Sequence, residues 1–409
     1  MSAAPPHARR RAEARASGAP PLAGVTVVTL EQAVAAPFAT RQLADLGARV
    51  IKIERPDGGD FARGYDTSVK GLSAHFVWLN RSKESLTLDL KHPAAADVLR
   101  RLLARADVFV QNLAPGASDR LGLSAAVLRA RDPRLIVCNV SGYGATGPYA
   151  TKKAYDLLVQ SEAGVVSITG TEETPCRVGL SIADIAAGMY AYSAVLTALV
   201  RRQTTGEGAT VDLSLFDALV EWMGFPLYHT AYTGQELRRS GPNHMSIAPY
   251  GPFRAADGHV FLSIQNAREW VRFCGEVLGQ PAMHDEERFR TNEARVTHRE
   301  PLRAAIEAVF ASLPLAEVEA RLERAQIAGA RMNSVAQVLE HPQLATRDRW
   351  VEIESEAGAL RAIKPPVSIE GVEPVMGAVP APGQHSAAIL EELGFDPGTV
   401  AGWRKERMV

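Results

Sequence analysis

The sequence predicts an α/β fold in which a large, Rossmann-like domain with a parallel sheet is joined to a smaller α/β domain. Two patterns support this prediction. From Val25 onward, short runs rich in β-branched residues alternate with helical stretches, and the runs are continuously apolar instead of alternating with polar residues. Continuous apolar runs separated by helices are typical of parallel strands that helices cover on both faces.

The elements of the large domain follow one another in a regular order. The expected strands cover residues 25–30, 49–54, 85–90, 107–112 and 134–140, and the helical stretches between them cover 36–47, 94–106 and 124–132. A long helix rich in Ala, Gly and Ser is expected over 184–202, because a glycine-bearing stop, TTGEG, follows it. A further strand over 209–215 and a helix over 217–229 complete this domain.

The rest of the chain predicts a second domain and a return segment. Around residue 233 the composition shifts to Gly, Pro, Asn and Ser, which indicates a linker. A hairpin that turns at Asp257-Gly258 and three amphipathic helical stretches then follow. The expected order is a disordered basic extension (1–21), the large domain (22–232), the linker (233–252), the small domain (253–332) and a segment returning to the large domain (333–409).

Composition excludes several classes of function. The 45 basic and 46 acidic residues give a formal charge of -1, so no overall field would attract nucleic acid or an anionic membrane. No stretch approaches the roughly 20 apolar residues that a membrane span requires. Cys138, Cys176 and Cys274 have no CxxC spacing, which favours reduced thiols in a cytoplasmic protein. No zinc-type His or Cys spacing occurs, so no metal site is expected.

The N-terminal stretch is basic and has no apolar segment, so it does not predict a secretory signal. A transit peptide stays open as an alternative to the disordered extension.

Cations follow several of the expected strands at the point where each strand ends. Arg55 comes after the second strand, Lys91 after the third, and Arg120 soon after the fourth. Ligands of an open parallel sheet bind outside the carboxyl ends of its strands, so these cations could meet at one crevice and hold a phosphate-bearing ligand. The alternative is that they are solvated surface charges.

A glycine pattern after the fifth strand raises the possibility of a dinucleotide site. Residues 142–147 read GYGATG, which matches GxGxxG. The dinucleotide fingerprint needs a helix that opens directly across the glycines, whereas Pro148 and a charged stretch follow here. The pattern therefore favours a loop that borders a site over a nicotinamide cofactor site.

Asp184 stands where the chain enters the long helix, and two roles are open to it. It could be an N-cap that accepts hydrogen bonds from free backbone amides. Spacing alone favours this cap, but the position also suits a nucleophilic carboxylate, because the positive end of a helix favours the ionised form and the small neighbouring residues leave room for a thioester.

Five segments follow one another along the chain, and they read LADLGARVIKIERPDGGDFAR, LNRSKESLTLDLKHP, VFVQNLAPGASDRLGL, SGYGATGP and ADIAAGM. In this order they resemble the class III CoA-transferases, also called the formyl-CoA transferase or carnitine CoA-transferase family. The resemblance runs from about Pro21 to the C-terminal ILEELGF. It implies an interlocked homodimer, an acyl-CoA and a carboxylic acid as small-molecule partners, and coenzyme A thioester as a substrate with no permanently bound cofactor.

The resemblance also implies roles for individual residues. Asp184 matches the catalytic aspartate of the family. The positions matched to coenzyme A contacts are Arg55, Lys91, Asn112, Leu113, Arg120 and Lys153. The backbone amides of Gln32 and Ala33 are expected to support an oxyanion, and Tyr155 is expected to lie beside the site.

Departures from the family pattern narrow the reaction. The 2-methylacyl-CoA racemase branch uses a His-Asp pair, and this chain has Tyr155 where that histidine would stand, so transfer is favoured over isomerisation because tyrosine has a pKa of about 10. Val34 replaces a glutamine of the oxalate-type members, which disfavours a formyl- or oxalyl-type transferase. The motifs look most like those of enzymes that pass CoA from succinyl-CoA to itaconate, mesaconate, citramalate or malate, with Arg41 or Arg63 as candidates for the second carboxylate.

Overall fold

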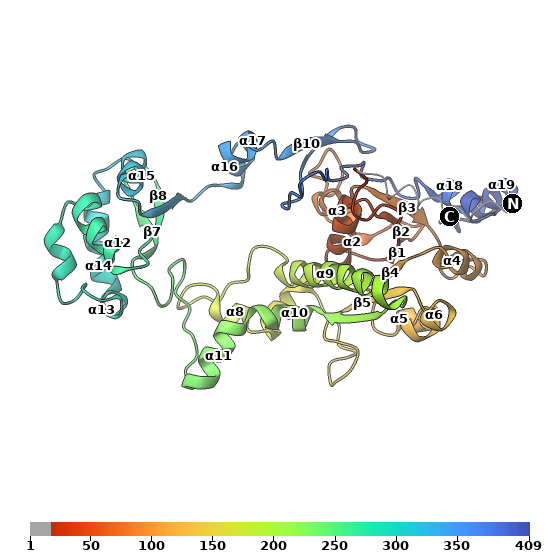
Figure 1. The fold of residues 1–409 in the computed structure, drawn as a ribbon, viewed down its shortest axis with the longest axis horizontal. Coiled ribbons are helices and arrows are strands. Elements are labelled where there is room, and N and C mark those ends of the chain that lie inside the picture. Colours follow the sequence, from red (N-terminus) through yellow and green to blue (C-terminus); the bar gives the residue numbers. More distant parts are fainter. Residues whose placement is uncertain (1–17) are drawn as a thin grey trace. The chain divides into compact units, whose positions relative to one another are not determined.

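The computed structural model describes residues 18–409, which form two compact units (Figure 1). The first unit contains the described residues up to Ala163 together with Gly179–Gly224 and Thr346–Val409. The second contains Gly164–Val178 and Phe225–Ala345. Apart from its last four residues, the extension expected over 1–21 lies outside the described part of the chain.

The first unit is built on a six-stranded sheet in the order β3-β2-β1-β4-β5-β6, and every pairing in it is parallel. The strands are β1 (Thr26–Leu30), β2 (Arg49–Glu54), β3 (Lys83–Thr87), β4 (Val108–Gln111), β5 (Ile136–Ser141) and β6 (Thr210–Ser214). The α/β fold with a parallel sheet is therefore confirmed. β3 begins and ends earlier than expected, and beyond its end the N–H of Asp89 donates to the carbonyl of Met408 instead of to a neighbouring strand.

Helices cover both faces of this sheet. On one face, α4 (Ala95–Leu103), α6 (Ala125–Arg131), α18 (Ser386–Glu392) and α19 (Pro397–Lys405) contribute side chains to a single apolar core with the strands. α2 (Ala35–Asp45) and α9 (Ile182–Thr205) pack against each other, and both contact strands of the sheet. The carboxyl-terminal helices belong to this unit because the N–H of Thr87 in β3 donates to the hydroxyl of Ser386 at 3.0 Å.

The contact between α9 and α2 depends on a missing side chain. A Cβ atom at Gly188 would lie 2.7 Å from the carbonyl oxygen of Ala35 and 2.9 Å from Cδ1 of Phe38. Ala183, Ala187 and Ala191 are also buried on α9, so a row of small residues brings the two helix backbones close together.

α9 corrects the expectation that no stretch of the chain approaches the apolar length of a membrane span. Its 24 residues contain an 18-residue stretch with a mean hydropathy of 1.4, so by length and composition alone it could cross a membrane. A single helix of this kind is weak evidence of a span, since the core helix of a globular domain has the same properties. Its small residues here are buried against α2.

The second unit contains an antiparallel three-stranded sheet in the order β7-β8-β9. Its strands are β7 (Tyr250–Arg254), β8 (His259–Ser263) and β9 (Ala328–Arg331). The β7–β8 pair is the hairpin predicted around Asp257-Gly258. Its principal helices are α12 (Ala267–Arg272), α14 (Arg299–Phe310) and α15 (Leu315–Arg324), which pack on a core with Phe253, Trp270 and Phe273.

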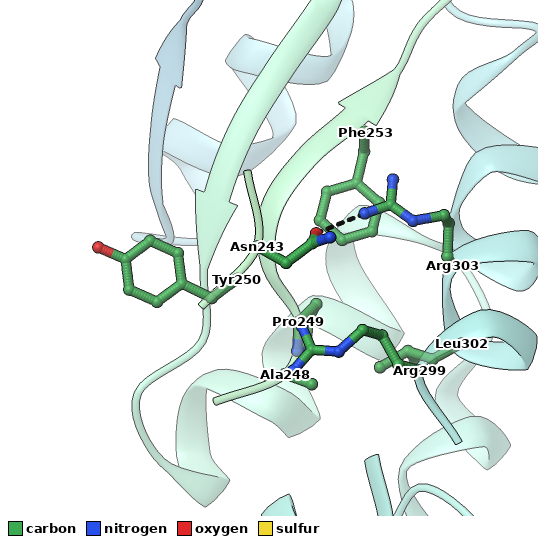
Figure 2. A pocket seen from close by; sticks show the side chains of 8 residues that line it. All are labelled: Asn243, Ala248, Pro249, Tyr250, Phe253, Arg299, Leu302 and Arg303. Carbon is green, nitrogen blue, oxygen red and sulfur yellow. Dashed lines mark hydrogen bonds between the residues drawn. The ribbon is translucent and has the colours of Figure 1, made fainter. Parts of the chain in front are cut away.

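The segment before β7, expected to be a linker, is tied to α14 by two arginines that line a small pocket (Figure 2). Arg299 donates to the carbonyl of His244 at 2.8 Å. Arg303 donates to the carbonyl of Pro252 at 2.7 Å and to Oδ1 of Asn243 at 2.6 Å. These two guanidinium groups hold the segment before β7 against α14, so the residues that line the pocket stabilise the fold of the second unit.

A stretch of the second unit was not anticipated from the sequence. Residues 164–178, with the short helix α8 (Val165–Ile168), lie in the middle of the chain expected to form the large domain. Arg239 holds them to the second unit by donating to the carbonyls of Ser167, Thr171 and Glu172. Backbone-to-arginine contacts of this kind leave no pattern in the sequence.

The carboxyl-terminal segment adds a hairpin to the first unit. β10 (Trp350–Ile353) and β11 (Leu360–Ile363) pair antiparallel, and Ile353 and Leu360 join a small core with Phe76 of α3 (Ala74–Asn80).

Gly188→Ala should disturb the α9–α2 contact, because its Cβ would overlap the Ala35 carbonyl. We expect the free energy of unfolding to fall by about 1–3 kcal/mol, as for other overpacked cores. Urea denaturation of the purified variant measures this change.

Gly402→Ala is the matched control, since Gly402 lies in α19 and no heavy atom lies within 4 Å of the position that a Cβ would take there. Alanine at this position should leave stability unchanged or raise it by up to about 1 kcal/mol. Equal stability of the two variants would contradict the close helix contact.

Candidate active site

The topology gathers several loops at the edge of the sheet where the parallel strands end. The loops after β1, β2, β3, β4 and β5 all leave the sheet there. α9 ends at Thr205 and β6 starts at Thr210, so the helix runs opposite to the strands and its first turn points toward the same edge. Gly188, one turn after Asp184, contacts Ala35 at the start of α2. Asp184 therefore lies close to the β1–α2 connection.

Asp184 is the third residue of α9, and its carboxylate does not cap the helix. The helix begins at Ile182, two residues earlier than the sequence suggested, after Ser181, which makes no side-chain cap. Oδ1 of Asp156 accepts hydrogen bonds from the N–H groups of Ala183 at 2.8 Å and Asp184 at 3.4 Å. The N-cap alternative for Asp184 is therefore wrong, because another carboxylate occupies that role.

The Asp184 carboxylate has an unusual electrostatic setting. Among residues 18–409 its oxygens accept no hydrogen bond and make no ion pair, and the residue is half-buried. Burial, and after it the negative charge of Asp156, raises the pKa of Asp184 to about 7. A carboxylate with a raised pKa is a stronger nucleophile in its ionised form, and this one is not engaged by the chain around it.

Two tyrosines accompany this carboxylate. Tyr65 follows the short helix η1 (Phe61–Gly64), and burial together with the charges of Asp60 and Asp184 raises its pKa to about 12. Tyr155 immediately precedes α7 (Asp156–Glu162) and is 68% exposed. Tyr65 was not among the residues predicted for the site, because nothing in its local sequence distinguishes it from a surface aromatic.

The backbone amides of the β1–α2 connection are already engaged. The N–H of Gln32 donates to Oδ1 of Asn112 at 2.8 Å, and the Nδ2 of Asn112 donates back to the Gln32 carbonyl at 2.9 Å. The N–H of Ala33, whose φ is +60°, donates to Oδ1 of Asp60 at 3.1 Å. The expectation that these amides support an oxyanion is corrected, since both have acceptors within the chain. The amide of Asn112 is likewise used to join two loops.

A buried network of charges lies beneath this connection. Lys52 Nζ is 2.7 Å from Oδ2 of Asp60 and 3.4 Å from Oε1 of Glu31, and Lys83 Nζ is 2.6 Å from the same Glu31 oxygen. All four side chains are fully buried. Burial alone would raise the pKa of Glu31, but the charges of Lys83 and Lys52 outweigh it and lower the pKa to about 2. The network fixes Asp60, which in turn holds Ala33.

The predicted coenzyme A cations lie on the loops of this edge. Arg55 directly follows β2 and has a side chain that is 58% exposed. Lys91, Arg120 and Lys153 lie after β3, in α5 (Ala117–Arg120) and before α7 respectively, and none of them is buried. Leu113 differs, since its side chain packs against the apolar core and its N–H donates to Gln111 Oε1 at 2.8 Å. The cations are exposed on these loops, whereas Leu113 is held by the apolar core.

The two arginines considered for a second substrate carboxylate are committed elsewhere. Arg41 is buried and pairs with Asp45 at 2.7 Å. Arg63 donates to both carboxylate oxygens of Glu54 at 2.8 Å and stacks over the ring of Phe76 at 3.6 Å. Both guanidinium groups already have a carboxylate partner, so neither is free to bind another.

Cysteine reactivity does not enter this site. Cys138 and Cys274 are buried free thiols, and burial raises the pKa of each to about 12. Cys176 is also free but exposed, in the segment that belongs to the second unit.

Comparison with known proteins gives a consistent result. A family model described as CoA-transferase family III matches residues 22–386. The chain is 34% identical over 385 residues to the succinate–glutarate CoA-transferase of Agrobacterium fabrum, which covers 91% of this chain and 96% of that protein. It is 30% identical over 387 residues to the succinyl-CoA:mesaconate CoA-transferase of Haloarcula marismortui, covering 91% and 96%.

A solved structure agrees with these relatives. The crystal structure of a CAIB/BAIF family protein from Brucella suis superposes with a TM-score of 0.83 at 32% identity, and covers 91% of this chain and 99% of that one. The chain therefore belongs to CoA-transferase family III, and it is an enzyme of the class III CoA-transferase type.

Proposed function

We propose that this enzyme moves coenzyme A from succinyl-CoA to a four- or five-carbon dicarboxylic acid, with Asp184 as the covalent nucleophile. The observation that carries the proposal is the position of Asp184, half-buried at the first turn of α9 with no hydrogen bond to its carboxylate among residues 18–409. Such a carboxylate is ready to attack a thioester carbonyl.

The proposed transfer proceeds through two kinds of intermediate. The Asp184 carboxylate attacks the donor thioester carbonyl, the C–S bond breaks, and a mixed anhydride and the CoA thiolate form. The thiolate attacks the aspartyl carbonyl and releases the donor acid, leaving an aspartyl-CoA thioester. The acceptor carboxylate attacks this thioester to give a second anhydride, and the released thiolate then takes the acceptor acyl group and frees Asp184.

This series of reaction steps conserves the energy of the thioester, provided that water does not reach the anhydride. The glycine-bearing loop at 142–147, which follows β5, lies on the same edge of the sheet and is proposed to shield the intermediate. The phosphates of coenzyme A are proposed to be bound by Arg55, Lys91, Arg120 and Lys153. The proposed reaction needs no resident cofactor, because coenzyme A enters as part of the substrate.

The proposed acceptors rest on the relatives. Two of them are named for transfer between succinyl-CoA and mesaconate, or succinate and glutarate, which are dicarboxylates of four or five carbons. Itaconate, citramalate and malate fall in the same chemical class. Arg41 and Arg63 already have carboxylate partners, so neither is proposed to bind the second carboxylate of the acceptor.

We also propose that the enzyme works as a homodimer in the cytoplasm. Exposed apolar side chains along α9 and in α10 (Leu215–Trp222) support this, because a second copy would cover them. They are Met189, Tyr190, Val200 and Trp222.

Asp184→Asn should remove transfer, because the amide cannot form an anhydride. We expect kcat to fall by at least about a thousandfold while coenzyme A still binds. Incubation of the wild type with succinyl-CoA and hydroxylamine should convert Asp184 to a hydroxamate, detected by peptide mass spectrometry.

Asp285→Asn is the matched control, with a side chain that is 77% exposed in the second unit. It should keep wild-type kcat. An Asp184→Asn variant that transfers CoA at the wild-type rate would refute the nucleophile assignment.

A panel of acids with succinyl-CoA as donor tests the substrate class. We expect the highest kcat/KM with glutarate, mesaconate, itaconate, citramalate or malate. Chromatography of the acyl-CoA products measures these rates. A preference for formate or oxalate would favour the formyl- or oxalyl-type reaction. Exchange of an α-proton with deuterated water in the absence of transfer would instead favour the isomerase.

Arg55→Ala and Lys91→Ala should each raise KM for succinyl-CoA by about tenfold, the cost of one lost charge-assisted contact of about 1.4 kcal/mol, and leave kcat unchanged. The effect should shrink at high salt. It should vanish with a succinyl thioester of pantetheine, which lacks the phosphates.

Arg254→Ala provides the comparison, since Arg254 is exposed on β7 of the second unit. Its KM should equal that of the wild type. If Arg55→Ala and Lys91→Ala raised KM for the pantetheine thioester as much as KM for succinyl-CoA, these cations would not act through the phosphates.

A further inference from the structure

Asp156 connects two helices at the candidate site. It is the first residue of α7, and its Oδ1 accepts hydrogen bonds from the N–H groups of Ala183 and Asp184 at the start of α9. Ser181, the residue in the N-cap position of α9, makes no side-chain cap. The first turn of the nucleophile's helix is therefore held by a carboxylate from a different helix.

The other oxygen of Asp156 is also fixed. Oδ2 accepts a hydrogen bond at 2.6 Å from Nε2 of Gln160, which is fully buried one turn further along α7. The same nitrogen of Gln160 lies 3.3 Å from the carbonyl of Leu180, just before α9. Asp156 and Gln160 thus bind α7 to the backbone on both sides of the start of α9.

Asp156 affects Asp184 through its negative charge as well as through its hydrogen bonds. Three N–H donors surround the Asp156 carboxylate and stabilise its negative charge. This charge is the second cause, after burial, of the raised pKa of Asp184. Two ionised carboxylates that lie close together repel each other, so the charge of Asp156 favours the protonated form of Asp184.

Other charged groups near Asp184 do not replace this effect. Tyr65, whose own pKa is raised by Asp60 and Asp184 after burial, is a neutral hydroxyl at ordinary pH. On α2, Arg41 pairs with Asp45, and burial followed by the charge of Asp45 raises the pKa of Tyr192, two turns beyond Asp184. Asp156 is the charged group that, next to burial, raises the pKa of Asp184.

We propose that Asp156 is a positioning residue for the nucleophile, which holds the first turn of α9 and places a second negative charge beside Asp184. This proposal rests on the assignment of Asp184 as nucleophile. The hydrogen bonds set where the nucleophile stands, and the charge adds to burial in raising the pH at which it becomes ionised. Both effects come from one side chain.

Three variants separate the two effects. Asp156→Asn keeps an oxygen acceptor for the α9 amides but removes the charge, Asp156→Glu keeps the charge, and Asp156→Ala removes both. In the wild type, kcat/KM should rise with pH through about 7 as Asp184 loses its proton. In Asp156→Asn this midpoint should move to lower pH, whereas in Asp156→Glu it should stay near that of the wild type.

Asp156→Ala should also lower kcat by at least about tenfold at all pH values, because the first turn of α9 loses its anchor. Glu162→Gln on the same helix is the control for a lost negative charge, since Glu162 pairs with Lys152. It should change neither the midpoint nor kcat. Thermal unfolding of each variant establishes that it is folded, and Asp156→Asn and Asp156→Glu still test the proposal where Asp156→Ala does not fold.

The outcomes distinguish this inference from the proposed function. An unshifted midpoint in Asp156→Asn, in an enzyme that Asp184→Asn inactivates, would overturn the role of Asp156 alone. Full activity of Asp184→Asn would instead overturn the nucleophile and, with it, the basis of this inference. A wild-type kcat in folded Asp156→Ala would show that the α9 amides need no anchor from α7.

Discussion

The close approach of α9 to α2 at Gly188 determines where the candidate nucleophile stands. No side chain separates the helix from the Ala35 carbonyl, so the two backbones meet directly. Because Asp184 lies one turn before this contact, its place relative to the β1–α2 connection follows from the packing of small residues. A helix packed against a neighbouring helix holds a side chain more firmly than a loop does.

The connection itself is held from below by buried charges. Taking ions out of water is costly, and a buried pair repays this only when each partner is fully hydrogen-bonded. Asp60 meets that condition, since it accepts from Lys52 and from the N–H groups of Ala33 and Ala62. The pair therefore gives the left-handed turn at Ala33 a single defined geometry, which an apolar core could not supply through packing alone. The rigidity of the edge comes from polar contacts as much as from apolar ones.

The sequence predicted the parallel sheet, the β7–β8 hairpin and a long helix that begins near Asp184, because these depend on local periodicity and on ordered motifs. It failed where contacts join distant segments. The expected start of α9 is two residues late, because the carboxylate of Asp156 that caps it comes from another helix. The amides of Gln32 and Ala33 were expected to be free, but their acceptors, Asn112 and Asp60, lie 80 and 27 residues away. Spacing along the chain carries no information about such partners.

The two buried lysines have a consequence for an enzyme that handles activated acyl groups. An amine attacks an anhydride or thioester only when it is unprotonated and within reach. The opposing carboxylates, although burial acts against them, raise the pKa of Lys52, which keeps it an ammonium ion. Lys83, whose pKa burial lowers to about 8, is sealed from solvent with no exposed side-chain surface. The interior cations beside the site are thus protected from self-acylation, and any such damage would fall on the exposed lysines of the outer loops.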